Sequence, residues 1–123
     1  MTVAAYTLAI VLNLLCLLIG YRFLFQPAPA AAGYGVPANP SGDTGAYLTI
    51  KGLRDGTFGI VGLALLAFVG ARAEAWFMLC VALVPLVDTR IVLRHGGTKA
   101  AAFGIHFATA VLVLISAALL FIV

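Results

Sequence analysis

The sequence has very little charge. Asp, Glu, Lys and Arg make up 9% of its 123 residues, against about 25% in soluble globular proteins. Hydrophobic residues make up 64%, and the mean hydropathy is +1.18. A water-soluble domain of this size cannot bury so much apolar surface. The composition therefore predicts an integral membrane protein, and the formal net charge of +3 gives no indication of nucleic-acid binding.

The sequence also lacks the common motifs of cofactor and metal chemistry. It contains no HExxH, GxSxG, GxxxxGK[ST] or GxGxxG string. Its two cysteines, Cys16 and Cys80, lie in apolar runs and form no CxxC pair, so we interpret them as small hydrophobic residues packed between helices. The histidines and aspartates show no metal-ligand spacing either. We therefore expect neither a metal nor a cofactor.

Four apolar segments are long enough to cross a membrane, which takes about 20 residues. The first has no Lys or Arg between Met1 and Thr7, so we interpret it as a membrane helix and not as a signal peptide. Four prolines and four glycines between the first two segments predict a long loop without regular structure. Two short turns join the other helices into an antiparallel series. The expected all-α bundle is a single domain with helices at residues 3–25, 46–69, 74–93 and 100–123 and the loop at 26–45.

Two features of these helices predict how they pack. Pro85 lies inside the third helix and should kink it, because proline leaves the carbonyl near Val81 without its hydrogen bond. The second helix is rich in glycine, and its Gly52-x-x-x-Gly56 spacing allows another helix to approach closely. The approaching helix belongs either to the same chain or, in a homo-oligomer, to a second copy.

The positive residues are divided unequally between the two membrane faces. Arg72 lies alone on one side, beside Glu74. Because cytoplasmic loops carry the excess of Lys and Arg, we expect the long loop and the turn at residues 95–99 to be cytoplasmic and both termini to lie outside. The positive residues on the long-loop side are Arg22, Lys51, Arg54, Arg90, Arg94 and Lys99.

Ionisable residues also occur inside the predicted helices, at similar depths. Lys51 is expected about 8 Å inside the second helix and Asp55 about 6 Å deeper. Asp88 and His106 are expected about 8 and 9 Å from the same membrane face. A charge that faces lipid at the helix centre costs roughly 2.5–3.5 kcal/mol, so we expect these residues and Arg54 to face inward. Together they predict a polar cavity that opens toward the cytoplasm.

Such a cavity favours an acid–base enzyme acting on a lipophilic small molecule, because ionisable groups within the membrane generally mark function. Asp55 should stay ionised beside Lys51, whereas Asp88 is farther from a sequence-local cation and is our candidate acid, with His106 as the base. Isomerisation, cyclisation or epoxide opening of an isoprenoid or polyketide fits these groups without a cofactor. Tyr34 lies on the long loop, which we expect to act as a lid. The predicted catalytic residues are Asp88, Asp55, His106 and Lys51, and the predicted substrate-binding residues are Arg54, Asn13, Tyr34, Tyr47 and Thr109.

Two alternatives remain open. The same charges can bind or transport a small molecule or ion, although four helices are too few for an alternating-access transporter unless the chain oligomerises. They can also form a structural salt-bridge network in an accessory subunit of a membrane complex. Substitution of Asp88 separates these possibilities, because an enzyme then loses turnover but keeps its fold, whereas a structural network loses stability.

Four strings along the chain carry a family resemblance. They are RFLFQP (22–27), GYGVP (33–37), YLTIKGLRD (47–55) and PLVDTRIVLRHGG (85–97), the last followed by His106. On these strings the chain resembles a family of small four-helix membrane proteins of bacteria and fungi that is catalogued as a domain of unknown function. It is more loosely similar to the DoxX-type four-helix membrane proteins. The resemblance implies the four-helix topology and names no substrate.

Overall fold

The computed structural model describes residues 1–123, which form helices and no strands. Four helical segments of 24 to 28 residues are long and apolar enough to cross a membrane. This confirms the predicted all-α architecture, and the chain is a multi-pass membrane protein. The elements are α1 (Thr2–Phe25), α2 (Pro27–Tyr34), α3 (Gly42–Phe68), α4 (Ala71–Val81), α5 (Leu83–Arg94), α6 (Lys99–Ala101), the π-helix η1 (Ala102–Phe107) and α7 (Ala108–Ile122).

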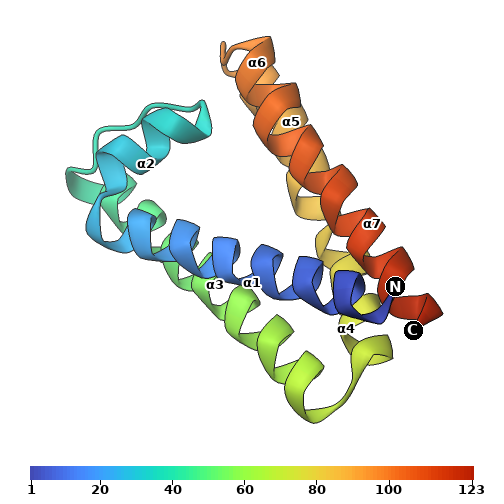
Figure 1. Cartoon of the computed structure of the whole chain (residues 1–123). Helices are drawn as coiled ribbons and strands as arrows, with labels where there is room; N and C mark the ends of the chain where they lie inside the picture. The colour runs from blue at the N-terminus through green and yellow to red at the C-terminus, as the bar shows by residue number, and fades with distance from the viewer.

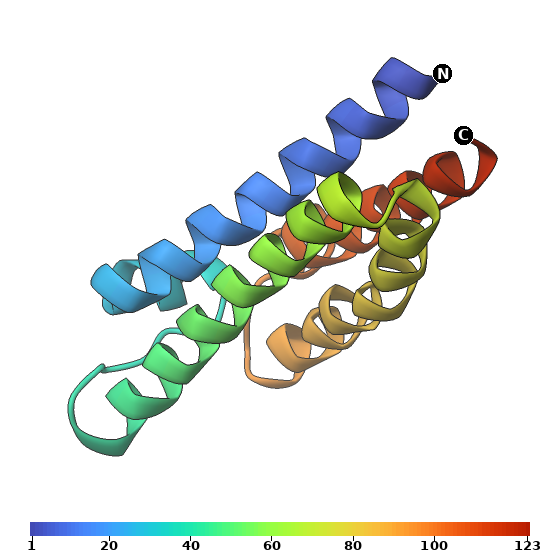
Figure 2. The same cartoon turned by 90° about the horizontal axis from the view of Figure 1, so that it is seen from below.

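The long helices form two pairs. α1 lies along α3, and the α4–α5 segment lies along η1 and α7. The two pairs lie close together at the end of the molecule that holds both chain termini, and they diverge toward the end that holds α2 (Figure 1). Figure 2 shows α1 and α3 side by side. We call these two ends the termini end and the α2 end.

Small residues pack the termini end. Ala5 and Ala9 of α1 are fully buried. They form one cluster with residues of α4 and α7. Small side chains allow membrane helices to approach closely, which matters because lipid offers no hydrophobic driving force for helix association. The other buried members of this cluster are Ala75, Met78, Ala117 and Leu120.

Glycines hold α1 against α3. A methyl group at Gly59 would lie 2.6 Å from the backbone oxygen of Asn13, and one at Gly52 would lie 2.9 Å from that of Gly20. The backbones of the two helices therefore meet directly. The second glycine of the predicted motif, Gly56, has open space where its own side chain would be. The glycine-rich face of α3 thus packs within the chain.

The third membrane segment is interrupted just before Pro85. α4 ends at Val81 and α5 begins at Leu83, because Pro85 has no N–H to donate to the carbonyl of Val81. The segment is therefore interrupted where Pro85 is predicted to kink it. The second part, α5, carries Asp88.

The connection between α1 and α3 is more ordered than predicted. Pro27 stands at the start of α2, where a missing N–H costs nothing, and the alanines at 30–32 favour helix. Gly35 ends the helix with a φ of 102°, a left-handed conformation that glycine adopts readily. α3 also begins earlier than predicted, at Gly42, so Lys51 lies about 13 Å from the start of its helix instead of about 8 Å.

Candidate functional site

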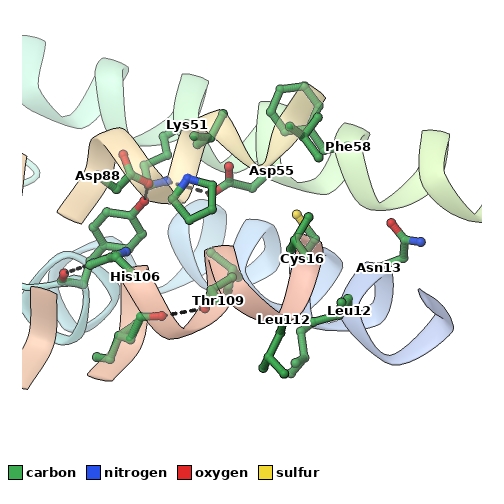
Figure 3. A pocket seen from close by; sticks show the side chains of 18 of the residues that line it. Leu12, Asn13, Cys16, Lys51, Asp55, Phe58, Asp88, His106, Thr109 and Leu112 are labelled. Atoms are coloured by element: carbon green, nitrogen blue, oxygen red, sulfur yellow. Dashed lines mark hydrogen bonds and ion pairs between the residues drawn. The ribbon is translucent and has the colours of Figure 1, made fainter. Parts of the chain in front are cut away.

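A cavity of about 400 Å³ lies between the two helix pairs. This volume is within the range of roughly 300–1,000 Å³ that is usual for small-molecule sites. Hydrophobic residues make up 15 of its 24 lining residues, so its walls suit a lipophilic molecule. Figure 3 shows Lys51, Asp55, Asp88 and His106 gathered at one end of the cavity and Asn13 at the other.

Tyr34 joins three elements at the α2 end of this cavity. Its hydroxyl donates a hydrogen bond to Oδ2 of Asp88 on α5. Its backbone oxygen lies 2.6 Å from Nε2 of His106 on η1. Its ring centroid lies 4.2 Å from that of His106 and 5.6 Å from that of Phe23 on α1. Through these contacts α2 bridges the two helix pairs.

The contact with Tyr34 fixes the tautomer of His106. A backbone carbonyl only accepts, so Nε2 must carry a hydrogen and, in the neutral ring, Nδ1 keeps the lone pair. His106 is only 3% exposed and lies in the π-helix η1. Single π-helical turns are frequent at functional sites. His106 is therefore both an anchor for Tyr34 and a potential proton acceptor.

The same contacts keep the Tyr34 phenol protonated. Burial raises the pKa of Tyr34, and the neighbouring Asp88 carboxylate raises it further, because a phenolate there would place two negative charges side by side. The phenol therefore donates and Asp88 accepts. This arrangement favours Asp88 as a base, whereas the sequence suggested an acid.

Lys51 and Asp55 form an ion pair one turn apart on α3. Lys51 Nζ lies 2.9 Å from Asp55 Oδ2, and the two side chains are 28% and 13% exposed. The ammonium also lies 4.2 Å from the ring centroid of Tyr34 and 4.8 Å from that of Phe23, which is within the range of cation–π interactions. Lys51 therefore links α3 to α2 and places a positive charge beside the Tyr34–Asp88 pair.

Asn13 and Thr109, both predicted to bind substrate, also line the cavity. The Thr109 hydroxyl donates to the Ile105 carbonyl of the preceding η1 turn at 2.6 Å, so only its acceptor capacity is free. Cys16, which we interpreted as a packing residue, borders the cavity as well.

Two predicted binding residues lie outside the cavity. Tyr47 is 72% exposed, and Arg54 is also exposed. The expected inward orientation of Arg54 is wrong. Lys51 and Asp55 occupy the cavity face of α3, and Arg54 points about 100° away from Asp55 around the helix.

Asn13 has a hydrogen-bond partner that the sequence did not predict. Glu74 is expected at the start of the third helix beside Arg72, but it is fully buried, and its Oε1 accepts a hydrogen bond from Asn13 Nδ2 at 2.7 Å. Helical spacing could have indicated that Glu74 faces inward, because Glu74, Met78 and Val81 are spaced i, i+4 and i+7 and so share one face of the segment. Met78 and Val81 line the cavity.

The polar groups do not form a metal centre. No group of three or more His, Cys, Asp or Glu side chains is placed to hold a metal ion, and the two aspartates are bonded to Lys51 and Tyr34. The arrangement instead offers proton transfer, with a carboxylate, a phenol, an imidazole and an ammonium at one end of an apolar space.

The family described as "Domain of unknown function (DUF4267)" matches residues 13–120. The chain belongs to the DUF4267 family. The DUF4267 match includes every polar cavity residue described above and confirms the resemblance to a small membrane family of unknown function. Comparison with curated proteins and with solved structures gave no match.

Proposed function

We propose that the protein is a cofactor-independent isomerase that acts on a lipophilic carbonyl compound in the membrane. The observation that carries this proposal is the hydrogen bond from the Tyr34 hydroxyl to Asp88 beside an apolar cavity. A carboxylate that is held as an acceptor can take a proton from a carbon acid. Isomerisation starts with proton removal, so it fits this arrangement better than cyclisation or epoxide opening, which start with proton delivery.

The proposed step is balanced within the substrate. Asp88 removes a proton from a carbon next to the substrate carbonyl, and the electron pair of the broken C–H bond moves to give an enolate. The protonated Asp88 no longer needs the Tyr34 hydrogen bond, so the phenol turns to the enolate oxygen, and Lys51 adds a positive charge. Asp88 then returns the proton to another carbon of the conjugated system, which moves the double bond and leaves the composition unchanged.

The other residues support these roles. Asp55 holds the Lys51 ammonium at 2.9 Å, and His106 holds the backbone of Tyr34 at 2.6 Å. α2 acts as a lid over the α2 end of the cavity, because Tyr34 joins it to α5 and η1. The apolar walls fit an isoprenoid or polyketide ketone.

Solvent-deuterium exchange tests the proposal before any substrate is known. Proteoliposomes that contain the protein are incubated in D2O with a total lipid extract of the native host, and carbonyl compounds are analysed by mass spectrometry. Because the Asp88 proton exchanges with solvent, one discrete compound should gain deuterium at carbon. The Asp88→Asn variant should do so about 10² to 10⁴ times more slowly. Asp43→Asn, the same change at an exposed carboxylate in the first turn of α3, should match the wild type.

Two other results would contradict an isomerase. If no compound exchanges and Asp88→Asn lowers the melting temperature, the charges are a structural network of the kind found in an accessory subunit. If a discrete compound binds the wild type but never exchanges, the cavity belongs to a binding or transport protein. A matched measurement of melting temperature for Asp43→Asn separates both results from a general effect of removing a carboxylate.

We also propose that the α2 end faces the cytoplasm and that both termini lie outside the cell. The exposed residues Arg90, Arg94 and Lys99 belong to the α2 end, whereas Arg72 lies in the first turn of α4 at the termini end, and the positive side is generally cytoplasmic. In a chain with both cysteines replaced by alanine, a membrane-impermeant maleimide should label Val69→Cys in intact cells. It should label Ser41→Cys only after the membrane is opened, and the opposite pattern would reverse the orientation.

A further inference from the structure

Asn13 is a buried polar residue of the cavity that the proposed reaction does not use. It is 5% exposed and lines the cavity. Figure 3 shows its amide at the opposite end from Lys51, Asp88 and His106. A buried amide needs partners for both its nitrogen and its oxygen, so the bonding of Asn13 indicates what this end of the cavity accepts.

The orientation of the Asn13 amide is fixed by two acceptors. Nδ2 donates to the backbone oxygen of Ala9 at 3.0 Å and to Oε1 of Glu74 at 2.7 Å. Because both partners are acceptors, the NH2 group must face them and Oδ1 must face away. Glu74 is fully buried, so it is a positioning residue that holds the amide in this orientation.

The Asn13 oxygen has space prepared for it but no protein donor. A methyl group at Gly62 of α3 would overlap Oδ1, so glycine at this position makes room for the oxygen. Among fully buried side-chain atoms, only Glu74 Oε2 and Ser116 Oγ lack a partner. Oδ1 is not one of them, so it is not fully buried, and its residue lines the cavity. A poorly hydrated acceptor without a donor is destabilising, and a bound molecule with a hydroxyl group removes that cost.

We propose that Asn13 binds a hydroxyl group at the far end of an elongated lipophilic substrate. The inference rests on the proposed function, which puts the substrate carbonyl near Lys51 and Tyr34. Gly62, which adjoins the Asn13 oxygen, lies about 10 Å from Asp55 and about 16 Å from Lys51 along α3. The ligand is therefore a largely apolar molecule with a carbonyl at one end and a hydroxyl roughly 10–16 Å away.

Two synthetic alkenones test this inference. Both have the same chain, which spans the distance from Lys51 to Asn13, and one ends in a hydroxyl whereas the other ends in a methyl group. Affinities are measured by titration in detergent micelles. The wild type should bind the hydroxylated probe about 10-fold more tightly, because one hydrogen bond to an otherwise unpaired group separates the two.

The variants separate recognition from stability and from chemistry. Asn13→Leu combined with Glu74→Leu replaces both polar partners by apolar groups, which keeps the fold nearly neutral in stability and should abolish the preference for the hydroxyl. Glu74→Gln retains an acceptor for Asn13 Nδ2 and should keep the preference. Asp88→Asn should also keep it while losing deuterium exchange.

Equal affinity of the wild type for the two probes would overturn the role of Asn13 and leave the isomerase proposal standing if exchange still depends on Asp88. A hydroxyl preference that survives in the Asn13→Leu/Glu74→Leu variant would likewise overturn it. A preference that depends on Asn13, in a protein that exchanges no compound, would support the hydroxyl site and refute the isomerase.

Discussion

Replacing Lys51 with methionine is expected to lower the free energy of unfolding by about 3 kcal/mol. The change leaves the Asp55 carboxylate without the ammonium that lies 2.9 Å away. Breaking a buried ion pair on one side costs roughly 3–5 kcal/mol, because the remaining charge is uncompensated. We expect the lower end of that range because the Lys51 side chain is 28% exposed. Equilibrium unfolding in mixed detergent micelles measures the effect.

The double variant Lys51→Met/Asp55→Leu should recover most of this loss. Removing both charges removes the unpaired one, and apolar replacements of a buried pair are often neutral or stabilising. Arg54→Gln removes an exposed charge from the same helix and should stay within about 0.5 kcal/mol of the wild type. If the double variant is as unstable as the single one, the loss comes instead from the cation–π contacts of Lys51 with Tyr34 and Phe23.

This double variant also separates the two interpretations of the charged cluster. If Lys51 and Asp55 serve only as a structural ion pair, a stable double variant should keep whatever ligand binding and exchange the wild type shows. In the proposed isomerase the Lys51 charge stabilises the enolate, so the double variant would fold and still be inactive. Measuring both stability and activity of the double variant therefore distinguishes a structural role of the Lys51–Asp55 pair from a catalytic one.

The sequence was informative where local patterns decide the structure. Hydropathy identified the four membrane segments, proline chemistry placed the break before Pro85, and helix rise put Lys51, Asp55 and His106 at comparable depths. The prolines and glycines of residues 26–45, taken together, predict a loop and so give no indication of the helix α2. Pro27 at a helix start and Gly35 at its end instead delimit a short helix.

The contacts that make the candidate site depend on the way the helices pack. The Tyr34–Asp88 and Asn13–Glu74 hydrogen bonds join residues that are 54 and 61 positions apart. Neither pair can be found from helical periodicity, which gives the face of a residue but not the helix that this face meets. Even within one helix, neighbouring residues face different directions. Asp55 faces the cavity, whereas Arg54, one residue earlier in α3, faces the outside.

Gly20→Ala is the substitution expected to damage the bundle most among small changes. Its new methyl group would lie 2.5 Å from the backbone nitrogen of Gly56 and 2.7 Å from the backbone oxygen of Gly52. These are backbone atoms of the facing helix, so no side chain can rotate away, and α1 must move apart from α3. Overpacking costs about 1–3 kcal/mol and occasionally more, and we expect about 3 kcal/mol or loss of folding.

Gly56→Ala is the matched control on the other side of the same contact. No atom lies within 4 Å of its added methyl group, and alanine favours helix over glycine by up to about 1 kcal/mol, so the melting temperature in detergent should stay level or rise. Separation of α1 from α3 also moves Phe23 away from Lys51, so Gly20→Ala should weaken ligand binding and Gly56→Ala should not. If Gly56→Ala is instead the damaging change, this part of α3 meets a helix from outside the chain. A homo-oligomer through the glycine-rich helix then becomes the better explanation.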